Sequence, residues 1–198
     1  MSQWNERYSE PGFAYGDAPN DFLVECATRI QPRGRVLSLG EGEGRNAVFL
    51  AQQGFAVTGV DNAEVGLAKA RALADERGSV IETVLADLAT FEMGDGQWDA
   101  IVSIWCHLPP AIRARVHRES VRALAPGGLF ILEAYTPAQL AFNSGGPRTI
   151  EMLYTADLLR EELAGLEVQL ARECEREVHE GRYHQGRSAV VQFVAKKP

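Results

Sequence analysis

The sequence predicts a doubly wound α/β fold, in which helices cover both faces of one mostly parallel sheet. The first observation is that short apolar runs alternate with helix-like segments over residues 35–135, a pattern typical of right-handed βαβ units. The second is the glycine-rich stretch LSLGEGEGRN, residues 37–46, which follows the first apolar run. In such folds the ligand binds at the carboxyl ends of the strands, so this stretch is expected to contact it.

The parallel part of the sheet is expected from five strands of ordinary length. Their β-branched and aliphatic residues form short runs bounded by turn residues, at 35–40, 55–61, 79–88, 98–105 and 129–135. Helices are expected at 21–30, 45–53, 63–77 and 109–125, where apolar residues recur at helical spacing. Asn20 and Asp21 are typical N-cap residues for the first helix, and Gly54 and Gly78 are typical C′ residues.

The last third of the chain departs from this alternation. Residues 141–150 are loop-like, and a short helix is expected over 155–165 with Thr155 as its N-cap. Two strand-like runs follow, at 166–174 and 188–195. The residues between them contain Gly181 and Gly186, which suit a hairpin, so the sheet is expected to end antiparallel.

Composition and charge narrow the class of partner. The 198 residues are 45% hydrophobic, which is enough for one domain with a sizeable core, and the net charge is -7. This charge argues against the basic surface that nucleic-acid binding requires, and no apolar run approaches the roughly 18 residues of a membrane span. The three cysteines are widely separated and form no CxxC pair, which indicates neither a disulfide framework nor a metal site. We expect a cytoplasmic monomer or homodimer that acts on a small molecule.

The glycine-rich stretch fits two kinds of cofactor. Residues 42–47 can be aligned with GxGxxA, a dinucleotide fingerprint, with Asp61 as the ribose-binding acid about 20 residues on. Alternatively, the three glycines of residues 40–44 form a loop around S-adenosylmethionine. A pyrophosphate would lie close to Glu41 and Glu43, and like charges about 4 Å apart cost on the order of 1 kcal/mol even in water. The sulfonium and amino groups of adenosylmethionine favour the second interpretation.

Two further acids lie at predicted strand ends. Asp61 ends the second strand and is placed to accept both ribose hydroxyls, while Asp87 follows the third strand and is expected beside the adenine amino group. Three strand ends therefore offer groups that suit one nucleoside cofactor.

These segments together resemble a known family. The motifs VLSLGEGEGRN, GVD, LADL, WDAIVSIW and LAPGGLFIL resemble class I methyltransferases over about residues 33–135. Within that class, GEGEGRNAVFLAQQGFAV is similar to the tellurite-resistance methyltransferases and their thiopurine-methylating relatives. The resemblance implies a seven-stranded sheet with an antiparallel last strand. It also implies S-adenosylmethionine as the cofactor and a small acceptor, namely a thiol, a selenium or tellurium species, an amine or a hydroxyl.

The resemblance also divides the single domain expected over residues 1–198. Residues 1–30 resemble a lid with a helix, residues 33–135 the cofactor-binding core, and residues 136–198 the part that carries a substrate loop, a helix and the hairpin. One position departs from the class, because Ser38 stands where an acid usually contacts the cofactor amino group. Glu41 is expected to take that role, directly or through water.

The site is expected to combine the loop, the strand ends and the lid. The cofactor-binding candidates are Arg7, Tyr15, Gly40, Glu41, Gly42, Arg45, Asn46, Asp61, Asn62, Asp87, Leu88 and Ile104. Methyl transfer from a sulfonium mainly requires alignment and exclusion of water, and His107 is the candidate base if the acceptor arrives protonated. The substrate candidates are Trp4, Tyr8, Tyr135, Arg148, Tyr183 and His184.

Several alternatives stay open at the level of sequence. His107 fits a capping or packing role as well as a catalytic one, and the N-terminal aromatics equally fit a terminal helix pinned to the sheet. The alternative functions are a nicotinamide-dependent oxidoreductase and a non-catalytic module that binds adenosylmethionine. A nucleic-acid methyltransferase is disfavoured by the acidic charge and by the lack of an Asn-Pro-Pro-aromatic motif.

Overall fold

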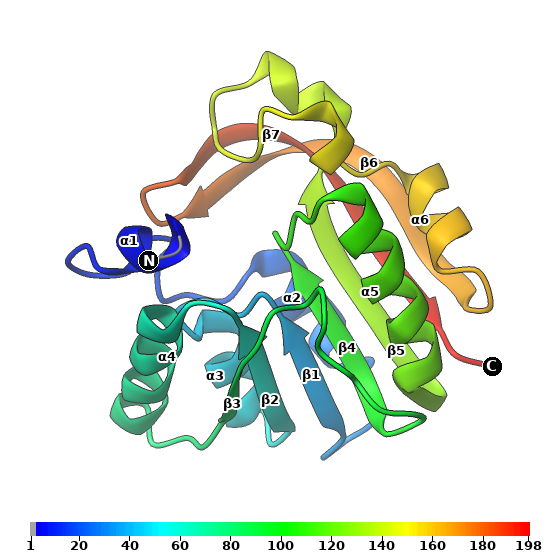
Figure 1. Cartoon of the computed structure of the whole chain (residues 1–198), viewed down its shortest axis with the longest axis horizontal. Coiled ribbons are helices and arrows are strands. Elements are labelled where there is room, and N and C mark those ends of the chain that lie inside the picture. Colours follow the sequence, from blue (N-terminus) through cyan, green and yellow to red (C-terminus); the bar gives the residue numbers. More distant parts are fainter. Residues whose placement is uncertain (1–2) are drawn as a thin grey trace.

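A computed structural model describes residues 3–198 and shows one seven-stranded sheet (Figure 1). The strands run in the order β3-β2-β1-β4-β5-β7-β6. Neighbouring strands from β3 to β5 pair in parallel, and β7 is antiparallel to both β5 and β6. The bounds are β1 (Arg35–Leu39), β2 (Ala56–Asp61), β3 (Glu82–Leu85), β4 (Trp98–Ile104), β5 (Leu124–Tyr135), β6 (Glu167–Glu180) and β7 (His184–Lys196). The predicted doubly wound sheet with an antiparallel end is confirmed.

Helices cover both faces of this sheet. The helices α2 (Asp21–Ala27), α3 (Arg45–Gln52) and α4 (Glu64–Glu76) lie on one face, and α5 (Pro110–Ala123) and α6 (Ala156–Glu162) lie on the other. The remaining helical segments are α1 (Gln3–Tyr8) and the 3₁₀ turns η1 (Pro137–Ala141) and η2 (Ile150–Met152). Two predicted caps are confirmed, because the side chains of Asn20 and Thr155 accept hydrogen bonds from the backbone of the first turns of α2 and α6.

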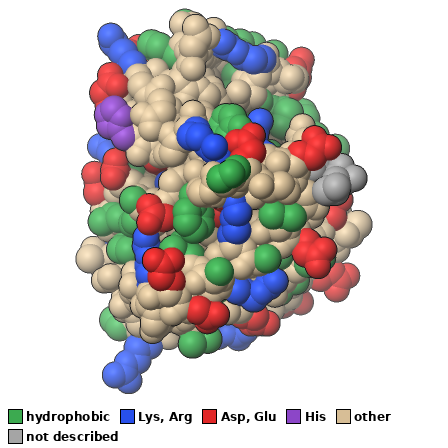
Figure 2. Space-filling view, turned by 90° about the vertical axis from the view of Figure 1, so that its left-hand side faces the viewer, with side chains coloured by type: hydrophobic (Ala, Val, Ile, Leu, Met, Phe, Trp, Pro, Cys, Tyr) green, Lys and Arg blue, Asp and Glu red, His purple; other side chains and the backbone are tan. Residues whose placement is uncertain are grey.

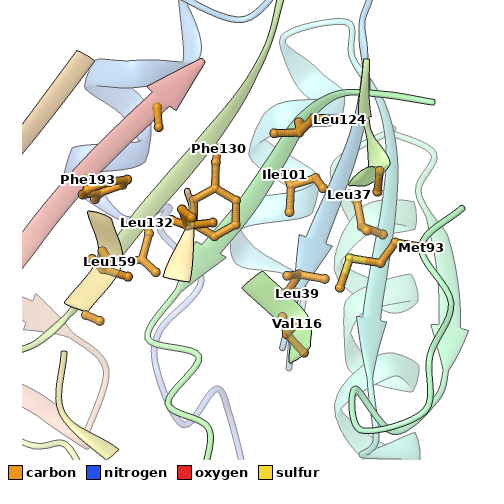
Figure 3. Close-up of a cluster of buried hydrophobic side chains, with 14 of the residues drawn as sticks. Leu37, Leu39, Met93, Ile101, Val116, Leu124, Phe130, Leu132, Leu159 and Phe193 are labelled. Carbon is orange, nitrogen blue, oxygen red and sulfur yellow. The ribbon is translucent and has the colours of Figure 1, made fainter. Parts of the chain in front are cut away.

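The larger core cluster lies between the sheet and helices α5 and α6 (Figure 3). Leu37 and Leu39 of β1, Ile101 of β4, and Phe130 and Leu132 of β5 contribute its centre and are almost fully buried. Each such side chain stabilises the fold by roughly 1.5 to 3 kcal/mol relative to an exposed one. This packing fixes the carboxyl ends of β1, β4 and β5, on which the candidate site is built.

Four predicted strands differ in extent from the observed ones. The third strand covers residues 82–85 instead of 79–88, because it is an edge strand that pairs only with β2. The strand β5 begins at Leu124, since Leu124 pairs with Trp98 of β4 and the pairing resumes at Leu129 after a register shift that contains residues 125–128. Residues 175–180 and 184–187 belong to the two hairpin strands. Exposed polar side chains such as Glu175 and Arg187 pair across these strands, so the sequence lacks the apolar alternation of a strand there.

The long β6–β7 hairpin extends beyond the rest of the sheet to the N-terminal segment, and its turn lies beside α1 (Figure 1). The backbone N–H of Arg182 donates to Ala14 O at 2.9 Å. The Tyr183 hydroxyl bonds the Glu10 carboxylate at 2.9 Å. Residues 3–20 are thereby held over the same edge of the sheet as the glycine loop, while residues 1 and 2 of the predicted lid lie outside the described residues.

The face that carries the N-terminal segment has a mixed charge pattern. Figure 2 shows acidic and basic side chains interspersed there, with no continuous basic surface on that face. Within residues 3–198, none of the helices is both long enough and apolar enough to cross a bilayer.

Candidate active site

The glycine loop follows β1 at the carboxyl edge of the parallel strands. Gly40, Gly42 and Gly44 all have positive φ, at 62°, 63° and 95°. A Cβ atom on Gly42 would lie 2.7 Å from the Tyr8 hydroxyl oxygen, and one on Gly40 would lie 2.8 Å from the Cys106 sulfur. The loop therefore needs glycine both for its left-handed turns and for its close approach to neighbours.

Asp61 connects this loop to the end of β2. Its Oδ2 accepts from the Gly42 backbone N–H and its Oδ1 from the Ala63 N–H, both at 2.8 Å. Burial raises the pKa of Asp61, and these N–H donors oppose that rise. The carboxylate is thus fixed at the strand end where the sequence places a ribose-binding acid.

The two glutamates of the loop do not lie where the sequence analysis expected them. The Glu41 carboxylate turns back beneath the loop, where Oε1 accepts from Ala47 N–H at the start of α3 at 2.9 Å. It fits because Ser38 is small and Gly59 has no side chain; a Cβ on Gly59 would lie 2.9 Å from Glu41 Cγ. Burial raises the pKa of Glu41 to about 7. Oε1 of Glu41 thus supports the loop, while Oε2 has no hydrogen-bond partner within residues 3–198, and its contact with a cofactor amino group stays a prediction.

Glu43 fastens the N-terminal segment to the loop. Its Oε2 accepts from Ala14 N–H at 2.7 Å and its Oε1 from Lys69 Nζ at 2.9 Å. The same ammonium group also donates to the carbonyls of Glu10 and Gly12. Both glutamates of the loop therefore have internal partners, and a contact of either one with a cationic cofactor stays a prediction.

Arg45 and Asn46 also differ from their expected cofactor roles. Arg45 forms a buried ion pair with Glu180 at 2.5 Å and donates to Ala18 O. Asn46 accepts from the backbone N–H of Asn20 at 3.0 Å. Both side chains leave the first turn of α3 toward α2 and the hairpin, so they join these parts of the fold.

The other cofactor candidates divide into two groups. Leu88 and Ile104 are buried in the two core clusters on opposite faces of the sheet, so their side chains serve packing. Asn62 and Asp87 are exposed beside the ends of β2 and β3, and their contact with a nucleoside stays a prediction.

The N-terminal segment lies directly on the loop. The Tyr8 ring covers Gly42 and Gly66, and the Trp4 ring is stacked on Tyr8 with ring centroids 6.0 Å apart. Arg7 donates to the Tyr15 hydroxyl at 2.6 Å. Burial raises the pKa of Tyr8, with the negative charge of Asp61 adding to the effect.

Beside the loop lies a group of rings that we call the aromatic cluster, formed by Tyr15, Trp105, Tyr135 and His184. Trp105 follows β4 and stacks on Tyr135 with centroids 4.4 Å apart, and His184 at the start of β7 lies 5.0 Å from Trp105. Trp105 has φ 56°, a left-handed conformation that is strained for a bulky residue and recurs at functional sites. Its Nε1 donates to Glu180.

Three buried side-chain atoms make no hydrogen bond within residues 3–198: Glu41 Oε2, Tyr135 Oη and His184 Nδ1. Two of them belong to the aromatic cluster. A buried polar atom without a partner costs about 1 to 3 kcal/mol, so such atoms are rare in folded proteins and call for an explanation. One such explanation is a ligand that supplies the missing hydrogen bonds.

Trp105 and Glu180 were absent from the predicted site. Trp105 could have been predicted as a site residue, because it is a large aromatic residue at the carboxyl end of a central strand. Glu180 gave no signal, because it appeared as one charge among many in a hairpin.

His107 does not match the expected free base. Its Nδ1 lies 2.7 Å from Met152 O, and its Nε2 lies 3.2 Å from Tyr135 N. A neutral ring that carries its proton on Nδ1 satisfies both backbone groups. Burial lowers the pKa of His107 to about 4. These contacts correspond to the packing alternative.

Arg148, the predicted contact for a substrate, lies in the loop before η2, and this role stays a prediction. It is exposed and donates to the carbonyls of Leu140 and Phe142 in its own loop. Its guanidinium group therefore holds the loop together.

His107→Ala should lower the free energy of unfolding by about 1 to 3 kcal/mol, because two backbone groups lose their partner. The contacts of the neutral ring stabilise the native state fully above about pH 6.5. Because burial lowers the folded-state pKa to about 4, the unfolded state binds a proton first as pH falls, and this stabilisation is lost toward pH 4. Urea unfolding at pH 7.5 and pH 5 should therefore show a smaller difference between variant and wild type at the lower pH. If the methyl-transfer rate of the wild type instead depends on pH near neutrality, and the variant lacks that dependence, the packing role is contradicted and His107 is the catalytic base.

Within residues 3–198, no three or more His, Cys, Asp or Glu side chains gather closely enough to hold a metal ion. Cys106 lies against Gly40, and burial raises the pKa of its thiol to about 12, so the sulfur is protonated at neutral pH.

Comparisons with known proteins point to one family. Residues 36–128 match the family described as methyltransferase domain. The chain is 28% identical over 145 residues to 2-heptyl-1-hydroxyquinolin-4(1H)-one methyltransferase of Mycobacteroides abscessus, covering 72% of this chain and 63% of the relative. It is 34% identical over 123 residues to demethylmenaquinone methyltransferase of Thermus thermophilus, covering 61% and 56%. The matches thus span less than two thirds of either relative.

The fold is shared with solved structures as well. The crystal structure of TehB from Haemophilus influenzae has a TM-score of 0.74 and 22% identity, covering 90% of this chain and 62% of that chain. Over residues 36–128 the chain is thus similar to the methyltransferase family, and its seven-stranded sheet has the fold of solved methyltransferase structures.

Proposed function

We propose that the chain binds S-adenosylmethionine and transfers its methyl group to a small-molecule acceptor. The observation that carries this proposal is the glycine loop, fixed to the carboxylate of Asp61 and adjacent to the aromatic cluster. The antiparallel β7 between β5 and β6 also favours a methyltransferase over a dinucleotide-dependent oxidoreductase, whose second half continues the parallel sheet.

The residues of the loop fit the cofactor. Gly40 and Gly42 form a cradle that Cβ atoms would fill. The Asp61 oxygens each accept one backbone N–H and retain lone pairs for ribose hydroxyls. Arg7 belongs to none of the ion pairs found in residues 3–198, so its guanidinium group is available for the cofactor carboxylate. When bound, the cofactor supplies an electrophilic methyl group on a sulfonium.

The protein's own contribution is alignment and exclusion of water. Lys69 and Glu43 hold the N-terminal segment over the loop, so that it shields the site from solvent. The aromatic rings beside the loop favour a sulfonium cation by roughly 1 kcal/mol or more. We assign residues 33–135 to cofactor binding, and the hairpin with the preceding loop to the acceptor side. The class of acceptor remains that of small soft or heteroaromatic molecules, as the names of the relatives suggest.

Asp61→Ala should weaken binding of S-adenosylhomocysteine by about 1.5 to 3 kcal/mol, or roughly 10- to 150-fold, because charged hydrogen bonds are lost. Isothermal titration calorimetry of the full chain measures this, with the exposed Asp75→Ala on α4 as the matched control. Unchanged affinity would refute the ribose role of Asp61. Binding of NADH without binding of S-adenosylhomocysteine would refute the proposed cofactor.

A screen with a labelled methyl donor tests catalysis directly. Thiols, selenite, tellurite, arsenite, amines and hydroxylated heteroaromatics form the panel. Methylated product from any of them supports the proposal, whereas tight cofactor binding with no product from the panel would favour a non-catalytic binding module.

A further inference from the structure

We propose that the groove between the carboxyl-terminal ends of α2 and α3 is a second ligand site, and that it takes a small amphipathic monocarboxylate whose charge lies on Arg33. The site is independent of the proposed methyl transfer, because it lies at the opposite edge of the sheet from the glycine loop. The observations that carry the inference are the apolar groove, an arginine without a partner in it and the left-handed backbone of that arginine.

The groove lies at the amino ends of β1 and β2. Its volume is about 680 Å³, within the size range of small-molecule pockets in proteins. The lining comes from the last turns of α2 and α3 and from the residues that lead into the two strands. The glycine loop follows the carboxyl end of β1, so the length of this strand separates the groove from the proposed cofactor site.

Apolar side chains form the floor of the groove. Ile30 is buried in the core cluster between the sheet and α2, and Phe49 and Phe55 pack against the same cluster. Val24 is 42% exposed, and both phenylalanines are only half-buried, so carbon surface in the groove still faces solvent. Removal of such surface from water is the main driving force for binding the apolar body of a ligand.

Most polar groups around the groove already have partners, but Arg33 does not. At the helix ends, Ala27 O accepts from Ile30 N–H and Leu50 O accepts from Phe55 N–H, at 3.2 and 3.3 Å. The guanidinium group of Arg33 takes part in no hydrogen bond or ion pair within residues 3–198. A free guanidinium group fits a carboxylate, to which it donates two parallel hydrogen bonds.

The charge around the groove favours an anion over a cation. Although the whole chain has a net charge of -7, none of the residues that line the groove within residues 3–198 is acidic. Thr28 and Gln53 add a hydroxyl and an amide to the lining. One guanidinium group compensates one negative charge, so a monocarboxylate matches the groove better than a dianion.

The backbone of Arg33 supports a role for its side chain. Gly34 N–H donates to Gln31 O at 2.9 Å and closes a tight turn, in which Pro32 is the second residue and Arg33 the third. Arg33 has φ 59°, and glycine or asparagine is favoured at a third turn residue with positive φ. The chain therefore keeps a long side chain at a strained position where that side chain makes no polar contact. Such strain is concentrated at binding and catalytic sites.

Titration calorimetry of the full chain tests the ligand class with four probes: decanoate, octanoate, acetate and decyltrimethylammonium. Decanoate should bind at least threefold more tightly than octanoate, because it covers more carbon surface, and acetate should not bind detectably. Decyltrimethylammonium has the same chain and the opposite charge, so it should bind at least tenfold more weakly than decanoate. Equal affinities for these two probes would overturn the proposal.

Two variants of Arg33 separate binding from stability. Arg33→Gly should weaken decanoate at least tenfold, whereas Arg33→Lys, which keeps the charge, should weaken it less. Arg33→Gly should also raise the urea midpoint, because glycine adopts the left-handed conformation without steric cost. If Arg33→Gly instead lowers the midpoint and leaves the affinity for decanoate unchanged, Arg33 is structural and the proposal is overturned.

A further variant tests the location of the ligand. Val24→Glu places a carboxylate on the exposed side of α2 in the groove and should weaken decanoate at least tenfold, whereas Arg118→Ala, exposed on α5, should not change it. Decanoate should bind equally well in the presence of saturating S-adenosylhomocysteine. Unchanged affinity in Val24→Glu, or loss of decanoate binding when the nucleoside is added, would place the ligand elsewhere and overturn the proposal.

Discussion

Glu180→Ala should lower the free energy of unfolding by about 3 to 5 kcal/mol, the usual cost of removing one partner from a buried ion pair. Glu180 is 6% exposed, and its two oxygens accept from four side chains. Oε2 receives Arg45 and Trp105, and Oε1 receives Asn20 and Arg176. Alanine would leave Arg45 buried without its carboxylate.

The same change should alter the site as well as the stability. Arg45 directly follows the glycine loop, and Trp105 is a wall of the aromatic cluster, so one carboxylate holds both halves of the proposed site. We therefore expect Glu180→Ala to weaken S-adenosylhomocysteine and acceptor binding together. A change confined to stability, with both affinities retained, would show that the two halves are positioned independently.

Urea unfolding at pH 7.5 measures the stability, with Glu175→Ala as the control. Glu175 lies on the same strand and pairs with Arg187 in solvent, so its loss should cost less than about 1 kcal/mol. Although burial raises the pKa of Glu180, Arg45 and Trp105 lower it by more. The stability gained from the charged carboxylate is therefore present above about pH 4.5 and lost below it, so the deficit of the variant should shrink at acid pH. Equal deficits for the two variants at pH 7.5 would contradict this account.

The sequence predicted those parts of the fold in which local pattern and tertiary role agree. The five parallel strands, the glycine loop and Asp61 at the end of β2 follow from apolar runs bounded by turn residues. The N-caps at Asn20 and Thr155 follow from side-chain chemistry that acts within one helical turn. The cofactor class could be inferred because its contacts lie on consecutive strand ends.

The direction of individual side chains could not be predicted in the same way. Glu41 turns beneath the loop because Gly59, on a neighbouring strand, leaves room for it, and a single stretch of sequence does not contain that pairing. His107 is held by the carbonyl of Met152 and the N–H of Tyr135, both far away along the chain. The aromatic cluster likewise joins residues 15, 105, 135 and 184, which only the closed fold brings together.

Gly44→Ala should destabilise the protein by about 2 to 5 kcal/mol, because it adds a steric overlap to a left-handed backbone. Gly44 has φ 95°, and a Cβ there would lie 2.6 Å from the Cα of the buried Ala70 on α4. Gly54→Ala is the matched control, since its φ is 90° and a Cβ would meet nothing within 4 Å. Both variants carry the backbone cost of roughly 1 to 2 kcal/mol, so their difference in urea unfolding isolates the overlap with α4.

The overlap should also reach the cofactor, because Gly44 ends the loop and caps α3 through its carbonyl, which accepts from Val48 N–H at 2.9 Å. Moving Gly44 away from Ala70 displaces Gly42, and with it the hydrogen bond that joins the loop to Asp61. Affinity for S-adenosylhomocysteine should therefore fall at least tenfold in folded Gly44→Ala and stay unchanged in Gly54→Ala. If both variants bind the nucleoside like the wild type, α4 yields to the new methyl group, and the path of the loop is set by Asp61 and Glu41 instead of by contact with Ala70.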